Sequence, residues 1–205
     1  MHPNPAFRQV DDATSLAFAR QRGFGVLGVN GSVGPIMIHV PFLLSDDGKF
    51  AEFHLVRSNE ISRLLSQPIP ATLSVNGPDG YVSPDWYGDG GQVPTWNYVA
   101  VHLRGHVEGL PDERLRDIVE RQTADFEGNI DGKAPWTLDK MDEDALSRMM
   151  RMIRPARMAI ERIESTWKLG QNKTDPARLG AAEQLTGGMG HELQSLAELM
   201  RSPPG

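Results

Sequence analysis

Hydrophobic and polar residues alternate with a period of two along several short stretches of the chain, which predicts β-strands. The clearest stretch is 98–108, where Val99, Val101 and Leu103 are expected to face one side. Hairpin turns are indicated by G-S-V-G-P at 31–35 and D-D-G at 46–48, and G-P-D-G at 77–80 is expected to end a strand. The other predicted strands cover residues 23–30, 36–44, 49–56, 71–75 and 157–164.

A period near 3.6 predicts helices between and after these strands. A short helix after residue 12 is expected to turn Leu16 and Phe18 inward, and Ser58 is the expected N-cap of a second one. The remaining predicted helices cover residues 111–123, residues 143–153 and the tail from Asp175.

The order of these elements predicts the fold class. Hairpin-linked strands, with one helix between the third and the fourth, then helices and a last strand, describe an antiparallel barrel with helical additions. The class is therefore mainly β with helical additions, or α+β. We expect residues 1–185 to form one domain and residues 186–205 to form a C-terminal helical tail.

The composition narrows the location of the protein and the chemistry open to it. A hydrophobic share of 39% and a charged share of 23% are ordinary for a globular protein. The absence of cysteine excludes disulfides, thiolate metal sites and a thiol nucleophile. No apolar run approaches the ~20 residues that a membrane span needs, and M-H-P-N-P-A-F-R lacks the features of a secretory signal. We expect a cytoplasmic protein with no membrane partner.

The charge argues against a direct DNA-binding protein. The net charge is −6, whereas proteins that bind duplex DNA usually carry a basic surface that neutralises phosphates. The densest basic segment, residues 148–158, places Arg148, Arg151 and Arg154 on one face of a predicted helix. A solvated face beside a methionine-rich core stripe explains this pattern, so direct DNA binding is doubtful.

One motif in the sequence is accidental. G-F-G-V-L-G, residues 23–28, matches the G-x-G-x-x-G fingerprint of dinucleotide-binding folds. That fingerprint must follow a strand and open a helix, whereas here it follows a helix and begins a strand. The match therefore carries no functional argument.

The histidines do not indicate a metal site. His102 and His106 lie four residues apart, which on a strand separates them by roughly 13 Å, too far for one metal ion. His39 and His54 lie late in their strands, where side chains line the rim of a barrel, and each is a structural histidine or a site residue with equal weight.

Two polar segments carry groups that suit a ligand. Arg57, Ser58 and Asn59 precede a predicted helix start, where a guanidinium and backbone N–H groups can hold a phosphate. W-K-L-G-Q-N-K, residues 167–173, follows the last strand with two lysines and two amides. From the local pattern alone, a plain N-cap and a basic turn remain the simpler explanations.

The aromatic residues give the most specific signal. All three tyrosines and two of the four tryptophans fall between residues 81 and 98. Together, Y-V-S-P-D-W-Y, V-P-T-W-N-Y-V-A-V-H-L-R-G, I-H-V-P-F-L-L and K-L-G-Q-N-K resemble the PaiB family of FMN-binding negative transcriptional regulators. The resemblance runs from H-P-N-P-A-F-R to about Leu185, and it implies an FMN-binding split barrel that dimerises with flavin at the subunit interface.

The resemblance implies a set of flavin-site residues. A flat, electron-poor ring with polar edges needs aromatic walls and a few fixed hydrogen-bond groups. Gly170 departs from the family pattern, which commonly has serine there. His39 is a further candidate, and no catalytic residue stands out. The candidates are Trp86, Trp96 and Tyr98 as walls, Ser83, Thr95 and Asn97 at the ring edges, Arg57, Ser58 and Asn59 at the phosphate, and Lys168, Gln171, Asn172 and Lys173 at the flavin or its substrate.

Three functions remain open at this point. The first is an FMN-binding regulator that acts through flavin or another small ligand, as the resemblance implies. The second is an FMN-dependent reductase or oxidase of a small molecule, in which the flavin carries the electron chemistry. The third is a split barrel that has lost flavin and serves as a binding module. In each case we expect a homodimer.

Overall fold

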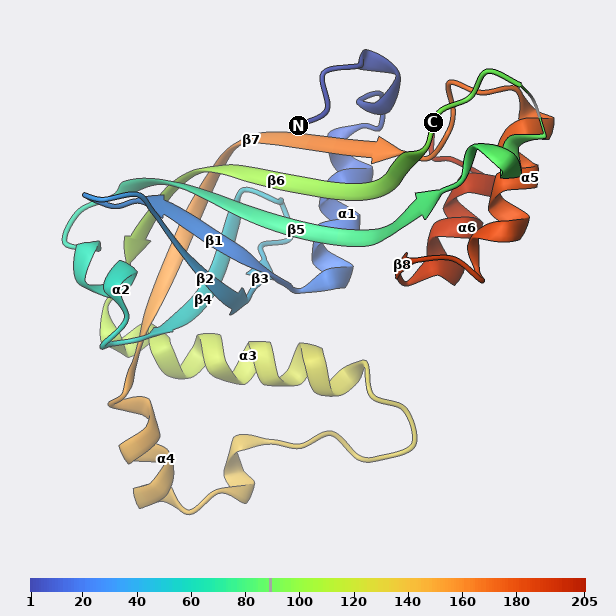
Figure 1. Cartoon of the computed structure of the whole chain (residues 1–205). Helices are drawn as coiled ribbons and strands as arrows, with labels where there is room; N and C mark the ends of the chain where they lie inside the picture. The colour runs from blue at the N-terminus through green and yellow to red at the C-terminus, as the bar shows by residue number, and fades with distance from the viewer. Residues whose placement is uncertain (89) are drawn as a thin grey trace. The chain divides into compact units, whose positions relative to one another are not determined.

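The computed structural model of the chain describes residues 1–88 and 90–205 (Figure 1). In these residues one sheet has the strand order β2-β1-β5-β6-β7-β4-β3, and β8 pairs with β5. The strands are β1 (Phe24–Asn30), β2 (Pro35–Pro41), β3 (Leu43–Leu44), β4 (Phe50–Val56), β5 (Ile69–Val82), β6 (Thr95–Gly109), β7 (Ile153–Lys168) and β8 (Gly190–His191). The helices are α1 (Asp12–Arg22), α2 (Glu60–Leu64), α3 (Leu115–Gly128), α4 (Glu143–Met150), α5 (Asp175–Leu185) and α6 (Leu193–Arg201), with short 3₁₀ turns at η1 (Pro5–Phe7), η2 (Pro84–Tyr87), η3 (Asp112–Arg114) and η4 (Leu138–Lys140).

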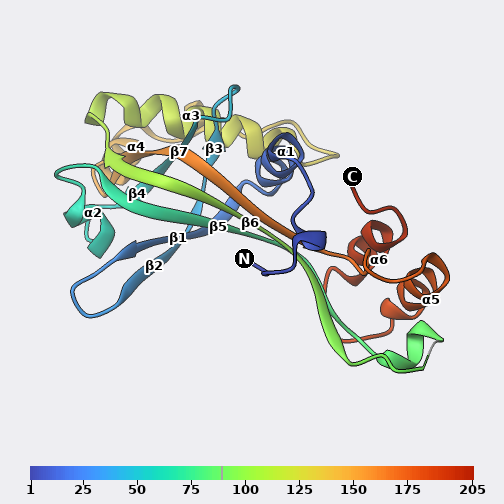
Figure 2. The ribbon, with the colours of Figure 1, turned by 90° about the horizontal axis from the view of Figure 1, so that it is seen from above.

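The predicted hairpin between the first two strands is confirmed. β1 and β2 pair antiparallel from Phe24↔Pro41 to Asn30↔Pro35 (Figure 2). The G-x-G-x-x-G letters lie at the start of β1 and no helix follows them, because the chain turns directly into β2. The expected second strand divides into β2 and β3 around Phe42. The Phe42 side chain is buried, and its backbone N–H donates to the Gly23 carbonyl.

The prediction that residues 77–80 end a strand is wrong, because β5 continues through them to Val82. Gly77 and Gly80 are there for space and not for a turn. A Cβ on Gly77 would lie 2.7 Å from the Phe18 ring, and one on Gly80 would lie 2.8 Å from Leu193. The glycines therefore let an unbroken strand pack closely against its neighbours.

The helices differ from the predicted ones in detail. In α1 the fully buried residues are Ser15 and Ala19, and Leu16 and Phe18 are only half-buried. The N-cap of α2 is Asn59 and not Ser58, because the Asn59 side chain accepts from the Ile61 N–H at 2.9 Å.

The predicted basic helix face is also wrong. Helix α4 ends at Met150, so Arg148 is helical whereas Arg154 lies in β7. Arg154 donates to the Ser62 carbonyl at 2.9 Å, which ties this guanidinium to the fold.

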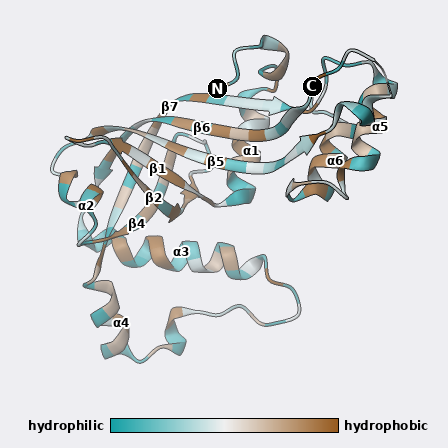
Figure 3. Cartoon of the chain, viewed as in Figure 1, coloured by the Kyte–Doolittle hydropathy of each residue, from teal (hydrophilic) through white to brown (hydrophobic). Residues whose placement is uncertain are grey.

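Backbone contacts divide the chain into two compact units. Unit 1 comprises residues 1–19, 75–102 and 163–205, and unit 2 comprises residues 20–74 and 103–162. The boundary expected after residue 185 stays a prediction. Figure 3 shows hydrophobic and hydrophilic positions interleaved along the strands and helices, as the alternating pattern requires.

The core of unit 1 joins the ends of the long strands to α5 and α6. Val82, Val99 and Trp167 are buried there with Leu185 and Leu196. The Phe18 ring meets the edge of Trp167 with a centroid distance of 5.3 Å. Burying these large side chains contributes roughly 1.5–3 kcal/mol each, so the core holds the loop after β5 and the turn after β7 in place.

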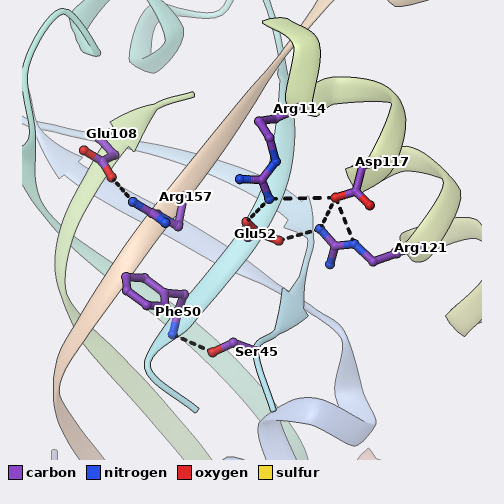
Figure 4. Close-up of polar contacts among 8 residues, drawn as sticks. All are labelled: Ser45, Phe50, Glu52, Glu108, Arg114, Asp117, Arg121 and Arg157. Carbon is purple, nitrogen blue, oxygen red and sulfur yellow. Dashed lines mark hydrogen bonds and ion pairs between the residues drawn. The ribbon is translucent and has the colours of Figure 1, made fainter. Parts of the chain in front are cut away.

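In unit 2, α3 is fastened to β4 by charged groups. The Glu52 carboxylate, whose side chain is only 15% exposed, accepts from Arg114 at 3.2 Å and from Arg121 at 2.6 Å (Figure 4). Asp117 accepts from the same Arg121 guanidinium at 2.8 Å. A second pair, Arg157 with Glu108 at 2.7 Å, joins β7 to β6. The arginines of this region are therefore part of the fold.

Candidate functional site

Two lysines at the end of β7 and in the following turn form the centre of the candidate site in unit 1. The Lys168 ammonium donates to the Thr95 hydroxyl, and the Lys173 ammonium donates to the Gln92 side-chain carbonyl. Burial, and then the charge of Lys173, lower the pKa of Lys168 below its ordinary value. We call Lys168, Lys173, Thr95 and Gln92 the lysine cluster. Its two cations are bound by neutral oxygens, so their charges remain available to an anionic or electron-rich ligand.

Aromatic rings lie beside both ammonium groups. Lys173 Nζ is 5.3 Å from the centre of the Tyr87 ring, and Lys168 Nζ is 5.9 Å from the centre of the Phe7 ring. Both distances are in the range of cation–π contacts. Burial raises the pKa of the Tyr87 hydroxyl, so this side chain stays neutral across the physiological range. The rings therefore add attraction for the cations without cancelling their charge.

The turn after β7 is held by its own side chains and by a glycine. The Gln171 side chain accepts from the Leu169 N–H at 2.8 Å and donates to the Trp167 carbonyl at 2.6 Å. Gly170 has φ of +81°, in the region that favours glycine. Gln171 therefore shapes the turn, whereas the neighbouring Asn172 is exposed.

The residues of the aromatic loop have separate structural roles. Trp86 packs against the buried core of unit 1, and a Cβ on Gly188 would lie 2.9 Å from its ring. Ser83 caps η2 by accepting from the Asp85 N–H. Asn97 is buried and donates to the Met200 sulfur at 3.5 Å. These three candidates support the fold, and their role as flavin contacts stays a prediction.

Trp96 is the most accessible of the three candidate wall rings, Trp86, Trp96 and Tyr98. Its side chain is 39% exposed, its indole N–H donates to Asp79 at 3.2 Å, and the Tyr81 ring meets its edge at 6.3 Å. Trp96 follows Thr95 directly in β6. An exposed indole is a suitable wall for a flat ring.

Tyr98 is a half-buried residue of β6 in unit 1, and the remaining candidates lie in unit 2. Arg57 donates to Asp112 at 2.7 Å and to the Arg151 carbonyl at 3.1 Å, so its guanidinium is already partly bound. Ser58 is exposed, and His39 is exposed and stacks on Phe24 with centroids 6.0 Å apart. The phosphate role of Arg57, Ser58 and Asn59 stays a prediction.

Three residues beside the lysines, Phe7, Tyr87 and Gln92, were missed in the sequence. Gln92 lies in a loop with no periodic pattern, and Phe7 lies in the N-terminal 3₁₀ turn, so neither could be assigned to the lysines from local sequence. Within residues 1–88 and 90–205, no group of three or more His, Cys, Asp or Glu side chains is arranged to hold a metal ion.

The fold is a split β-barrel with helical additions, and the assignment of these side chains to a flavin stays a prediction. Two ammonium groups on neutral partners and an exposed indole fit the polar edge and the flat face of FMN. The chain belongs to the FMN-binding family described as "Putative FMN-binding domain", whose sequence model matches residues 1–162. The predicted cofactor, FMN, is thereby confirmed.

A curated relative extends the match over almost the whole chain. The sequence is 27% identical over 199 residues to "Protease synthase and sporulation protein PAI 2" of Bacillus subtilis, covering 96% of this chain and 95% of the relative. The resemblance to the PaiB family is therefore confirmed.

Solved structures confirm the fold. The FAD and heme binding protein of Mycobacterium smegmatis superimposes with a TM-score of 0.58 at 16% identity, covering 90% of this chain and 82% of that one. The flavocytochrome Anf3 of Azotobacter vinelandii gives a TM-score of 0.56 at 12% identity, covering 82% and 72%. Among the residues that the structure describes, no helix has the length and apolar character of a membrane span.

Proposed function

We propose that the lysine cluster holds the electron-rich edge of the FMN ring and that Trp96 forms one wall of the same site. The observation that carries the proposal is that both ammonium groups bind neutral oxygens, Thr95 Oγ1 and Gln92 Oε1. Bound FMN supplies reversible two-electron chemistry, and fixed positive charge near the ring is one of the means by which a protein tunes it. Thr95 and Gln92 orient the two ammonium groups, and the buried Trp167 and Leu169 beside Lys168 limit its access to water.

Flavin titrations of lysine variants test this assignment. We expect Lys168→Met to weaken the binding of FMN and of riboflavin by about tenfold, because a charged hydrogen bond contributes roughly 1.5–3 kcal/mol. The matched control is Lys49→Met, since Lys49 is exposed and pairs with Asp47 in the turn before β4. Unchanged affinity for both flavins in Lys168→Met would remove the lysine cluster from the site.

We further propose that the protein acts in regulation, through FMN or a small ligand, without a high-affinity DNA contact of its own. The name of the Bacillus subtilis relative links that protein to protease synthase and sporulation. The net charge of −6 supports regulation without direct DNA binding. Arg154 and Arg157 support it too, because they bind the Ser62 carbonyl and Glu108 within the fold. A titration against the upstream DNA of its own gene at physiological salt tests this. Specific binding near 10⁻⁸ M would contradict it.

A second candidate function is an FMN-dependent oxidoreductase. The lowered pKa of Lys168 favours it, because desolvated, charged groups cluster at sites that carry out chemistry. Oxidation of NAD(P)H by the FMN-loaded protein, measured by absorbance, separates the two functions: turnover supports an enzyme, and its absence supports a regulator.

We propose a homodimer as the working form. The exposed Trp96 leaves a large aromatic ring at the surface of unit 1, and a second subunit would cover it. Sedimentation at micromolar concentration tests the proposal. A species near the chain mass of 22.6 kDa would contradict it.

A further inference from the structure

A surface groove of about 500 Å³ lies wholly in unit 2, and the proposed flavin site does not use it. Its walls come from four neighbouring strands, β1, β5, β6 and β7. The volume lies within the roughly 300–1,000 Å³ that small-molecule sites occupy. The groove is therefore large enough for one small ligand.

Glycines form part of the floor of the groove. A Cβ on Gly28 would have nothing closer than the Thr72 carbonyl at 3.8 Å, so the space above Gly28 is open. Gly105 is different, since a Cβ there would lie 1.8 Å from the Ala159 carbonyl. Gly105 is required by the approach of β7, whereas a side chain at Gly28 would extend into the groove without disturbing the sheet.

The charged groups on the walls favour an anion. Arg104 and Arg162 bring two guanidinium groups to the groove, and Arg104 lies 3.5 Å from the Thr72 hydroxyl. Among the described residues that line the groove, Glu161 is the one carboxylate. Its Oε1 atom lies 2.7 Å from Nδ1 of His106. Guanidinium groups bind phosphates and carboxylates with two parallel hydrogen bonds. The two arginines outweigh Glu161, so the walls carry a net positive charge. The Glu161 carboxylate can also accept a hydrogen bond from an N–H group of a ligand.

We propose that this groove binds a small planar organic anion of the nucleoside monophosphate class. The floor over Gly28 receives the ring, Arg104 and Arg162 hold the anionic group, and Glu161 accepts from an amino group on the ring. The site is formed by unit 2 alone and does not depend on the lysine cluster.

The test uses the full chain loaded with one equivalent of FMN, so that flavin does not also fill the groove, and titrates it with AMP by calorimetry. We expect saturable binding of one AMP per chain, with adenosine and inorganic phosphate each at least about tenfold weaker, because each lacks one half of the recognised ligand. Arg104→Gln should weaken AMP binding by about tenfold or more. Gly28→Val should abolish it, since the new side chain fills the floor while valine suits a strand.

The controls separate this site from the flavin site and from misfolding. Arg116→Gln, on the exposed face of α3, should leave AMP binding unchanged. Flavin absorbance should be the same in all variants, so loss of flavin and loss of AMP are read independently. If Gly28→Val fails to fold, Gly28→Ala, whose Cβ makes only ordinary contacts, takes its place with a smaller loss. No saturable AMP binding, equal binding of phosphate and AMP, or full AMP affinity in the Gly28 variants would overturn the proposal.

Discussion

The two units of this protein use their cations in different ways. In unit 2, three arginines that join elements are paired with carboxylates: Glu52 accepts from Arg114 and Arg121, and Glu108 accepts from Arg157. In unit 1, Lys168 and Lys173 are paired with a hydroxyl and an amide carbonyl. A cation neutralised by a carboxylate fastens one element to another, whereas a cation held by a neutral oxygen keeps its charge for a ligand.

The partner of a cation separates candidate ligand-binding residues from structural ones better than the residue type does. Arg57 was the most evident phosphate ligand in the sequence, yet it is bound to Asp112 and to a backbone carbonyl. Lys168 and Lys173 stood in what looked like an ordinary basic turn, yet the structure surrounds them with aromatic rings and neutral oxygens. The partner of a charged group, more than the group itself, indicates whether it acts in the fold or at a site.

The largest expected effect is on the stability that Glu52 provides. Glu52→Gln leaves the Arg114 and Arg121 guanidinium groups without their shared charge partner. Losing one member of a well-buried ion pair costs ~3–5 kcal/mol, but both arginines are nearly half exposed, so we expect a loss of about 2 kcal/mol. Urea unfolding measures it, and flavin affinity should not change.

The matched control is Glu120→Gln, because Glu120 pairs with Arg116 on the exposed face of the same helix. Such a pair contributes less than about 0.5 kcal/mol. Equal losses in the two variants would show that the Glu52 network does not fasten α3 to β4.

A smaller effect, on FMN affinity, is expected at Arg57, which pairs with a carboxylate and is also a candidate ligand of the FMN phosphate. If Arg57 binds the FMN phosphate in addition to Asp112, Arg57→Ala should weaken FMN by about tenfold and leave riboflavin, which lacks the phosphate, unchanged. Paired fluorescence titrations with the two flavins measure this. Equal losses would assign Arg57 to the fold, together with Arg114, Arg121 and Arg157.

The smallest effect is a pH dependence that comes from Lys168. Its pKa lies below the ordinary value of 10.5, first because of burial and then because of Lys173, so its charge begins to be lost at lower pH. We expect flavin affinity to fall a few-fold as pH rises toward 10.5, and Lys168→Met to remove that part of the fall. Because this pKa is lower in the folded than in the unfolded chain, the contribution of Lys168 to stability rises over the same range. Unfolding therefore does not explain the loss, whereas an identical pH profile in Lys168→Met would contradict this role.

Much of the fold could be predicted from alternation alone. Val99, Val101 and Leu103 are all buried, as the pattern of β6 requires. The strand prediction failed at glycines, because a glycine can either form a turn or make room for close packing. Glycines at 77 and 80 were interpreted as turn residues, but they allow close packing within β5.

The candidate site was less predictable for the same reason. The aromatic loop indicated a flavin site, yet Trp86 is used to pack against the core and Trp96 stays exposed, a division that depends on α5 and α6. Gln92 reaches Lys173 across 81 residues of sequence. No local pattern contains such a contact, so only the folded chain shows it.

The central claim is that Lys168 and Lys173 keep their charge for the flavin, and its most direct test is an NMR titration of these lysines. Their Cε resonances in ¹³C-labelled protein, assigned with the two Lys→Met variants, report each ammonium pKa with and without FMN. We expect a Lys168 pKa below 10.5 in the free protein that rises when FMN binds, because an electron-rich group favours the charged ammonium. Unchanged pKa values for both lysines, with flavin absorbance showing that FMN is bound, would show that the two ammonium groups do not contact the flavin.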